Sequence, residues 1–233
     1  MAIILNLETA TTNCSVCLAK HGKPLVVEEQ NTPNYSHSEQ LHIFIKKVVE
    51  RASLSLLDIA AVAVSKGPGS YTGLRIGVSA AKGLCFALDL PLISVPTLDN
   101  LAYQVTDNSF DYVIPVLDAR RMEVYSAVFR GRQEQIRETM AEIITEQSFS
   151  EYYKRGKTLI LGPGAQKCQE MLKHSNLHFD VDRIPSAREM AQLSHGKYQK
   201  TDFEDMAYFE PYYLKDFIGK KPSPKSKGTE NQG

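Results

Sequence analysis

The segment 66–77, Lys-Gly-Pro-Gly-Ser-Tyr-Thr-Gly-Leu-Arg-Ile-Gly, has the residue types and spacing of a loop that could bind an anion. A glycine-rich turn between a strand and a helix directs backbone N–H groups toward a negative group at the positive end of the helix. The segment is not a P-loop, because no Gly-Lys-Ser/Thr follows at the spacing which that motif requires. A tight strand-to-helix turn without any ligand is the alternative role for these glycines.

The cysteines do not predict a metal or redox site. Cys14 and Cys17 form a Cys-x-x-Cys pair, but the segment around them is expected to be a strand, where positions three apart point to opposite faces. No second Cys-x-x-Cys follows. Small buried thiols are therefore predicted.

The histidines do not supply a metal site either. His37 and His42 are separated by about 140° around a helix, which is too far for a shared ligand. His174 and His178 have a suitable spacing but no acidic or cysteine partner nearby, so they are expected to be surface residues. We therefore predict neither a metal ligand nor a catalytic residue in this chain.

The turn Asp-Ala-Arg-Arg at 118–121 places an aspartate, a possible catalytic group, at the tip of an expected hairpin. Such turns are more often solvated or held by an ion pair. A solvated or ion-paired turn is therefore predicted, with a subunit contact as the second interpretation.

Composition limits the function classes. The 233 residues contain 27 Lys+Arg and 27 Asp+Glu, so the net charge is zero, and a protein that binds RNA alone usually has a large positive excess. The end of the chain, 219–233, is rich in Lys, Pro, Ser and Gly and is predicted to be a disordered basic tail. No apolar run is long enough to span a membrane and no basic leader is seen, so we expect a cytoplasmic protein without membrane contact.

Periodicity predicts an α/β protein of two related halves. Strands are expected at 2–7, 14–19, 24–29, 57–65, 91–95, 112–117, 123–129 and 158–162, and helices at 36–52, 72–88, from Thr97, 165–173 and 185–200. Ser36 and Ser186 are suitable N-caps. Each half opens with a hairpin that has a polar turn, so a duplicated domain with mixed sheets and flanking helices is predicted. The expected divisions are a lobe 1–104, a smaller degenerate lobe 105–218 and the tail.

The helix 72–88 lacks bulk along much of its length. Each glycine inside a helix costs about 1 kcal/mol relative to alanine, so several of them imply close approach of another element. Packing inside the same domain is one explanation. The other is a contact in which helices 36–52 and 72–88 meet two helices of a second subunit. The interface predicted on that basis comprises Leu41, Ile45, Val48, Val49, Gly73, Gly77, Ala80, Ala81 and Leu84.

Several segments together resemble the TsaB family. They are the opening Ile-Leu-Asn-Leu-Glu-Thr-Ala-Thr at 4–11, the loop 66–77, the Ala-Ala-Lys-Gly-Leu at 80–84, and the segments 95–102 and 117–125. The ending Pro-Tyr-Tyr-Leu-Lys at 211–215 is similar to the family's Pro-x-Tyr-Leu-Arg, with Lys215 in the place of arginine. The resemblance implies an actin/Hsp70/sugar-kinase-like (ASKHA) fold of two related lobes, each with a mixed sheet and flanking helices.

The resemblance also implies what this chain lacks. The catalytic relative TsaD holds a metal with a His-x-x-x-His pair, and the matching positions here are Thr97 and Leu101. Neither half has the Asp-x-Gly-Thr phosphate loop of the superfamily, so the nucleotide pocket is expected to be vestigial. It is predicted at Glu8, Thr9, Gly67, Gly69, Ser70, Gly162 and Gly164.

The function implied by this family is that of a non-catalytic scaffold or activator subunit. It would pair with TsaD and TsaE during transfer of the threonylcarbamoyl group from its adenylate to adenosine in tRNA, or self-associate as a homodimer. No cofactor is expected to bind this chain alone, and any ATP or ADP is expected to bind where two subunits meet. The chain is expected to contact tRNA only indirectly, through the complex. A metallopeptidase and a small-molecule kinase of the same superfamily are the alternatives, and both would need catalytic residues that the sequence does not supply.

Overall fold

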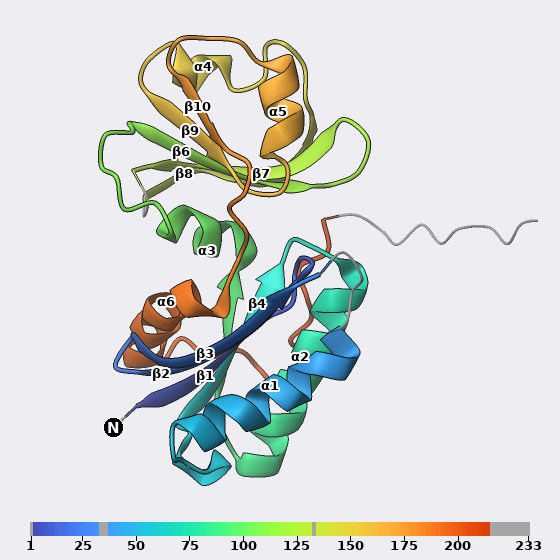
Figure 1. Ribbon diagram of the computed structural model, residues 1–233, viewed down its shortest axis with the longest axis vertical. Coiled ribbons are helices and arrows are strands. Elements are labelled where there is room, and N and C mark those ends of the chain that lie inside the picture. The colour runs from blue at the N-terminus through green and yellow to red at the C-terminus, as the bar shows by residue number, and fades with distance from the viewer. Residues whose placement is uncertain (1, 33–36, 132–133, 215–233) are drawn as a thin grey trace, which may run out of the picture.

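The computed structural model describes residues 2–32, 37–131 and 134–214. The chain forms two lobes stacked along the long axis of the molecule (Figure 1), each built around a five-stranded mixed sheet. No helix among these residues is long and apolar enough to cross a membrane.

The first sheet has the strand order β3-β2-β1-β4-β5. Its strands are β1 (Ile3–Glu8), β2 (Asn13–Lys20), β3 (Lys23–Asn31), β4 (Ala61–Gly67) and β5 (Leu92–Pro96). β1, β2 and β3 pair antiparallel, whereas β1, β4 and β5 pair parallel. The central strand β1 is buried along its whole length, because helices cover both faces of the sheet.

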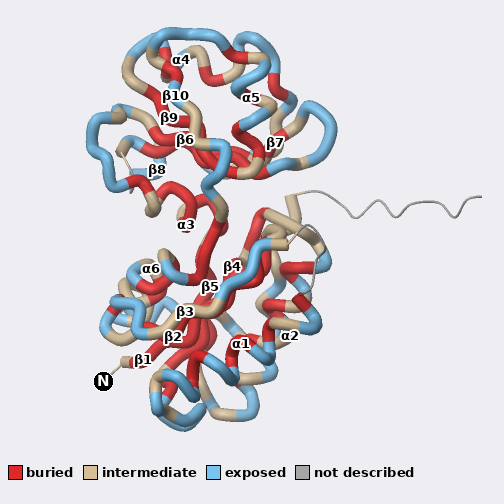
Figure 2. Tube along the Cα trace, in the orientation of Figure 1, coloured by how far each residue is buried: buried red, intermediate tan, exposed pale blue. Residues whose placement is uncertain are grey.

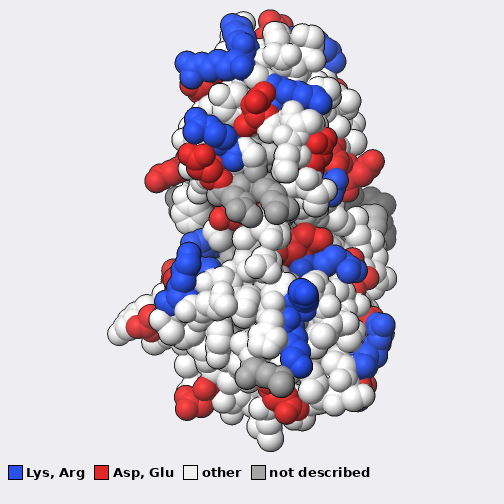
Figure 3. Space-filling model, turned by 90° about the vertical axis from the view of Figure 1, so that its left-hand side faces the viewer, with Lys and Arg blue, Asp and Glu red and all other residues white. Residues whose placement is uncertain are grey.

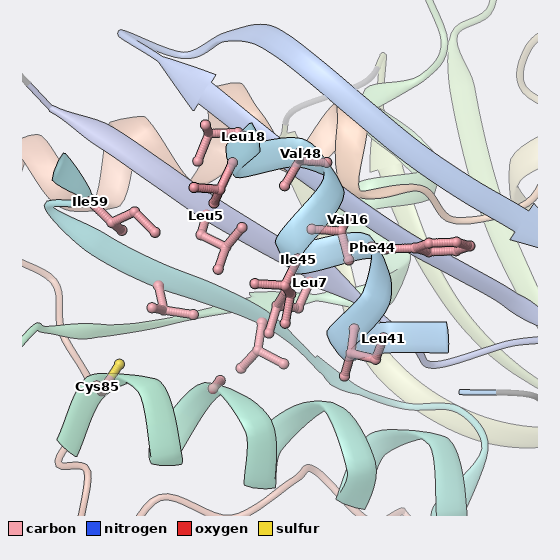
Figure 4. Packing of buried hydrophobic residues seen from close by; sticks show 14 of the residues in the cluster. Leu5, Leu7, Val16, Leu18, Leu41, Phe44, Ile45, Val48, Ile59 and Cys85 are labelled. Atoms are coloured by element: carbon pink, nitrogen blue, oxygen red, sulfur yellow. The ribbon is translucent and has the colours of Figure 1, made fainter. Parts of the chain in front are cut away.

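Two helices cover one face of this sheet and a third covers the other. α1 (His37–Arg51) and α2 (Tyr71–Leu88) pack their apolar sides against β1, β2 and β4, as Figure 4 shows for Leu41, Ile45 and Val48. α6 (Ala187–Gln199) packs on the opposite face. A 3₁₀ turn (Leu56–Asp58) leads into β4. The predicted helix 36–52 is thus confirmed as α1, although its predicted cap Ser36 lies outside the described residues.

The second sheet has the order β10-β9-β6-β7-β8. Its strands are β6 (Tyr112–Asp118), β7 (Glu123–Arg130), β8 (Glu134–Ile143), β9 (Thr158–Leu161) and β10 (Leu177–Asp180). Here too the first three strands form an antiparallel meander and the last two extend the sheet in parallel. This is the topology of the first sheet repeated in the same chain order, so the prediction of two related lobes is confirmed.

α4 (Ser150–Tyr153) and α5 (Ala165–Met171) cover one face of the second sheet, and α3 (Thr97–Tyr103) covers the other. Each lobe therefore receives one helix from the other half of the sequence. α3 follows the last strand of the first sheet but packs on the second, and Figure 2 shows it buried at the junction of the lobes. α6 follows the last strand of the second sheet but packs on the first.

This exchange corrects the predicted lobe boundaries of 1–104 and 105–218. After α6 the chain stays on the first lobe, where Glu204 bridges to Leu92 and the Tyr212 amide donates to the Lys66 carbonyl at 2.7 Å. Residues 187–214 thus belong structurally with the first sheet, because the apolar face of α6 covers it. The predicted tail 219–233 lies outside the described residues.

The predicted orientation of the first two cysteines is confirmed. Cys14 lies in the core beneath α1 and Cys17 in the core beneath α6, on opposite faces of the sheet. All four cysteines are free and buried. Burial raises the pKa of the Cys17 thiol to about 12, which keeps it in the unreactive thiol form.

Candidate functional site

Parallel strands of the first sheet end at one edge, which is where open α/β proteins bind ligands. Glu8 ends β1 at this edge and its side chain is fully buried. One carboxylate oxygen accepts the Ala10 amide at 2.8 Å, and the other accepts the Asn100 side-chain amide at 2.9 Å. Burial raises the pKa of Glu8 above its ordinary value, and these hydrogen bonds act in the opposite direction. The carboxyl group thus joins β1 to α3 and does not face solvent.

The two positions that the family resemblance relates to a metal-binding histidine pair are also closed. Thr97 and Leu101 are fully buried on α3. Leu101 packs into the core of the second lobe, so its side chain contributes to the junction between the lobes. Among the described residues, no group of three His, Cys, Asp or Glu side chains is arranged to hold a metal ion.

The glycines of the first Gly-Pro-Gly loop serve close packing. A Cβ on Gly69 would lie 2.4 Å from the Ala10 carbonyl oxygen, and that oxygen accepts the Ser70 amide at 2.7 Å. Gly67 has φ +105°, a conformation that favours glycine, and the Tyr212 carbonyl lies 2.9 Å from the position of its Cβ. The Ser70 amide, which could have met an anion at the start of α2, therefore donates to the chain itself.

The matching loop of the second lobe is built in the same way. Gly162 has φ +110°, and its amide donates to the Asp180 carbonyl at 3.0 Å. The Gly164 amide donates to the Val116 carbonyl at 3.1 Å. The predicted nucleotide residues thus lie in three segments: Glu8 and Thr9 at the end of β1, Gly67, Gly69 and Ser70 in the loop before α2, and Gly162 and Gly164 in the matching loop of the second lobe.

The glycines of α2 admit the turn between β1 and β2. The Thr9 hydroxyl donates to the Gly73 carbonyl at 2.8 Å. A Cβ on Gly73 would lie 2.1 Å from the Thr9 carbonyl oxygen, and one on Gly77 would lie 2.3 Å from the Thr9 hydroxyl oxygen. Packing inside the same lobe is therefore the reason for these two glycines.

Most of the predicted partner interface is consequently corrected. The apolar stripe of α1 faces its own sheet, because burying that stripe is what holds a surface helix on its lobe. Ala81 is buried in the same core. Seven predicted residues are buried within the lobe and do not form its surface: Leu41, Ile45, Val48, Val49, Gly73, Gly77 and Ala81.

A groove between α1 and α2 occupies the surface where the interface was predicted. It has a volume of about 560 Å³. Ala80 and Leu84, the two remaining predicted residues, line it. Gly83 also lines it, and a Cβ there would meet no atom within 4 Å. The groove residues that the sequence did not predict are Ser38, His42, Arg75, Ile76, Ser79 and Gly83. Ser79 and Gly83 had a signal in the sequence, because small residues recur at helical spacing on the outer face of helix 72–88.

A second hollow, of about 460 Å³, lies where the chain returns from β10 to α6. Three consecutive carbonyls of this return segment accept amide side chains: Ile184 from Gln104 at 2.8 Å, Pro185 from Asn13 at 3.0 Å and Ser186 from Asn100 at 3.0 Å. Ser186 caps α6 as predicted, since its hydroxyl accepts the Arg188 amide at 3.2 Å. These bonds hold the crossing between the lobes in one conformation.

Comparisons relate the chain to known proteins. The family model of TsaD, described as tRNA N6-adenosine threonylcarbamoyltransferase, matches residues 31–216. A curated relative from Escherichia coli (strain K12), named tRNA threonylcarbamoyladenosine biosynthesis protein TsaB, is 30% identical over 95% of this chain and 98% of its own. A relative from Bacillus subtilis (strain 168), named tRNA N6-adenosine threonylcarbamoyltransferase, is 29% identical over 84% of this chain and 59% of its own.

A solved structure from Pseudomonas aeruginosa, described as an uncharacterized protein with similarity to peptidase YEAZ, superposes with a TM-score of 0.82. It is 24% identical, and the match covers 92% of this chain and 100% of that one. At this identity the likeness concerns the fold. With the repeated sheet topology, it agrees with the actin/Hsp70/sugar-kinase-like fold predicted from the sequence.

Proposed function

Because the chain belongs to the TsaB family, we propose that it acts as a non-catalytic subunit that docks on a TsaD-type enzyme through the groove between α1 and α2. Its role lies in the biosynthesis of threonylcarbamoyladenosine on tRNA. In the proposed reaction the partner transfers the threonylcarbamoyl group from its adenylate to adenosine, and this chain stabilises the partner in its active form.

The observation that carries the proposal is the groove itself. Ala80 and Gly83 have small or no side chains on the α2 side of the groove, so the backbone of another helix can approach closely. Phe86, three residues after Gly83 on the same helix, is 80% exposed, and exposed aromatic side chains are enriched in protein interfaces. Two helices from each subunit would then form a four-helix contact.

A non-catalytic role is supported by the edge of the first sheet. Thr97 carries a hydroxyl and Leu101 an aliphatic side chain, so neither can supply an imidazole ligand, and both are buried. The buried carboxyl of Glu8 is held by Ala10 and Asn100, away from any substrate. We find no feature of the described residues that favours the metallopeptidase or kinase alternatives.

The proposed assembly has the TsaD-type enzyme as its main partner and TsaE as a further component. A second copy of this chain occupies the same groove when the enzyme is absent, since a surface that accepts two helices of a relative suits those of the chain itself. ATP or ADP is proposed at the joint between subunits. The Ser70 and Gly164 amides of the two Gly-Pro-Gly loops already donate to backbone carbonyls, so these two amides are not available to a phosphate within this chain.

The test is a pair of matched substitutions. Gly83→Arg places a long charged side chain in the groove, and its Cβ meets no other atom within 4 Å. Gly196→Arg is the control: its Cβ is equally free of contacts, but it lies on α6, on the other face of the sheet. Binding to the TsaD-type enzyme of the same organism is measured by sedimentation velocity. Gly83→Arg should abolish assembly and Gly196→Arg should leave it intact, with the Tm of both variants at or above that of the wild type.

Assembly of the Gly83→Arg variant with wild-type affinity would remove the proposal. Gly77→Arg is unsuitable for this purpose, because its Cβ would lie 2.3 Å from the Thr9 hydroxyl oxygen and the change would disrupt the fold.

A further inference from the structure

The hairpin between β6 and β7 has two consecutive residues in a conformation that side chains rarely adopt. Arg120 has φ +71° and Arg121 has φ +49°. Hairpin turns with positive φ are normally made from Asn, Asp or Gly, because other side chains strain the backbone there. Such strain persists where the surroundings hold it and where the residue has a use. The sequence therefore retains two arginines at a place where Asn-Gly would fold more easily.

A lysine from α5 holds this turn in shape. The Lys167 ammonium donates to the Asp118 carboxylate at 2.7 Å, to the Arg121 carbonyl at 2.6 Å and to the Glu123 carbonyl at 3.0 Å. The Asp118 carboxylate also accepts the Arg120 amide at 2.6 Å. The turn is thus ion-paired, as one of the predicted alternatives had it. Asp118 and Lys167 form the pair and neutralise each other's charge. The tip is rigid before it meets any ligand.

The arginine side chains themselves project from the tip. Both residues are exposed. Within the part of the chain that the structure describes, neither guanidinium has an ion-pair or hydrogen-bond partner, so two positive charges stand together on a fixed support. Guanidinium groups bind phosphate oxygens through paired hydrogen bonds, which a rigid support makes more favourable.

We propose that the Arg120–Arg121 tip contacts the phosphate backbone of the tRNA on which the assembled complex acts. This inference rests on the proposed function, because the anion is the substrate of the partner enzyme. A net charge of zero argues against strong binding of RNA by the chain alone, and Figure 3 shows basic and acidic side chains interspersed on one face of the molecule. Two arginines on this chain would extend the RNA-binding surface of the partner enzyme. Such a small contact does not require a broad basic surface on this chain.

The position of the tip suits this role. In Figure 1 the turn between β6 and β7 lies on the same side of the molecule as α2. The tip and the proposed docking groove therefore face one side of the molecule, so an RNA that runs along that side of the complex would pass the tip. The exposed apolar side chains of Met122 and Ile143 lie next to the tip, and they would instead suit a protein that docks there.

The experiment uses the complete complex of this chain with its TsaD-type enzyme and an unmodified tRNA transcript. The Kd for tRNA is measured by fluorescence anisotropy at several salt concentrations. The double variant Arg120→Ala/Arg121→Ala should assemble normally, bind tRNA about tenfold more weakly, and lower the slope of log K against log salt by about 1–2. The matched control is Lys154→Ala/Arg155→Ala, which removes two exposed cations just after α4 and should change neither quantity.

A second variant separates function from folding. Arg120→Asn/Arg121→Gly relieves the backbone strain, so its Tm should rise by a few degrees while tRNA binding weakens as in the alanine variant. An unchanged Kd and salt slope in an assembled complex would overturn the inference. Loss of assembly in the absence of RNA would also overturn it, because the tip would then be a protein contact. If the wild-type chain forms no complex, the proposed function fails first and the tRNA contact fails with it.

Discussion

The two lobes hold the tips of their first hairpins in opposite ways. In the first lobe the turn between β1 and β2 lies against α2, where Gly69 and Gly73 leave room for it. In the second lobe the turn between β6 and β7 is held by the ammonium of Lys167 on α5 and stays exposed. α2 and α5 each follow a Gly-Pro-Gly loop and are therefore equivalent helices. The tip of the first hairpin is thus buried against this helix in the first lobe and exposed to solvent in the second.

This difference shows that a repeated topology need not repeat a site. The first-lobe edge encloses Glu8 and Thr97, so its polar groups serve the junction between the lobes. The second-lobe turn leaves Arg120 and Arg121 free to meet another molecule.

Gly73→Ala tests the burial of the first tip and should have the largest effect. The new Cβ would lie 2.1 Å from the Thr9 carbonyl oxygen, a backbone atom that cannot easily move aside. We expect the free energy of unfolding to fall by about 3 kcal/mol. Urea denaturation is compared with that of Gly196→Ala, whose Cβ meets nothing within 4 Å. Equal stability of the two variants would show that the turn does not rest on α2.

Asp99→Asn tests the closed edge of the first lobe through its pH dependence. Burial raises the pKa of Asp99 to about 6, while Lys66 and Lys197 act to lower it. The folded protein therefore holds this proton more tightly than the unfolded chain, whose carboxyl has a pKa of about 4. The contribution of Asp99 to the wild-type free energy of unfolding should therefore decrease as the pH rises from about 4 to about 6, because its carboxyl ionises more easily in the unfolded chain. Above about pH 6 this contribution should remain constant.

The asparagine variant should not show this fall. Relative to the wild type, it should gain about 2 kcal/mol between pH 4 and pH 7, measured by urea denaturation at a series of pH values. A constant difference between the two proteins over this range would mean that Asp99 titrates as an exposed carboxyl, so α3 would not close the edge.

Lys167→Met tests the support of the second tip. The change removes three hydrogen bonds to the turn but leaves its carbonyls and Asp118 within reach of water, so the loss should be about 1–2 kcal/mol. The control is Lys173→Met, which removes an exposed lysine that donates to the Gln169 carbonyl. If both variants unfold at the same urea concentration, the turn keeps its shape without Lys167.

Gly83→Ala should have the smallest effect and the opposite sign to Gly73→Ala on the same helix. Its Cβ enters open space in the groove, so only the helix propensity changes and stability should rise by about 0.5–1 kcal/mol. Thermal unfolding measures the difference. A loss of stability would mean that the groove is closed by the lobe itself.

Much of the fold could be predicted because its elements have strong local signals. The stripe of α1 and the polar turn of the first hairpin identified their elements directly. The strands β8 and β10 were missed for physical reasons. β8 is an edge strand with charged and half-exposed residues along its length, and β10 has only four residues. Neither has the alternation or the apolar run that identifies a strand.

The interface was harder to predict than the fold. Sequence alone does not distinguish an apolar stripe that faces its own sheet from one that faces a partner, so Leu41 and Ile45 were assigned to the wrong surface. The same ambiguity affected Gly73 and Gly77, which lie against a turn that is distant in sequence. Ala80 and Leu84 line the groove, so they stay in the docking surface that we propose.

The most direct test of the central claim is a reconstitution of threonylcarbamoyladenosine formation on an unmodified tRNA transcript. The reaction contains the TsaD-type enzyme, TsaE, ATP and threonylcarbamoyl-adenylate, with this chain either absent, wild type or Gly83→Arg. Our account predicts product only when the wild-type chain is present together with the enzyme. Product from this chain without the enzyme, or equal product in its absence, would contradict the account.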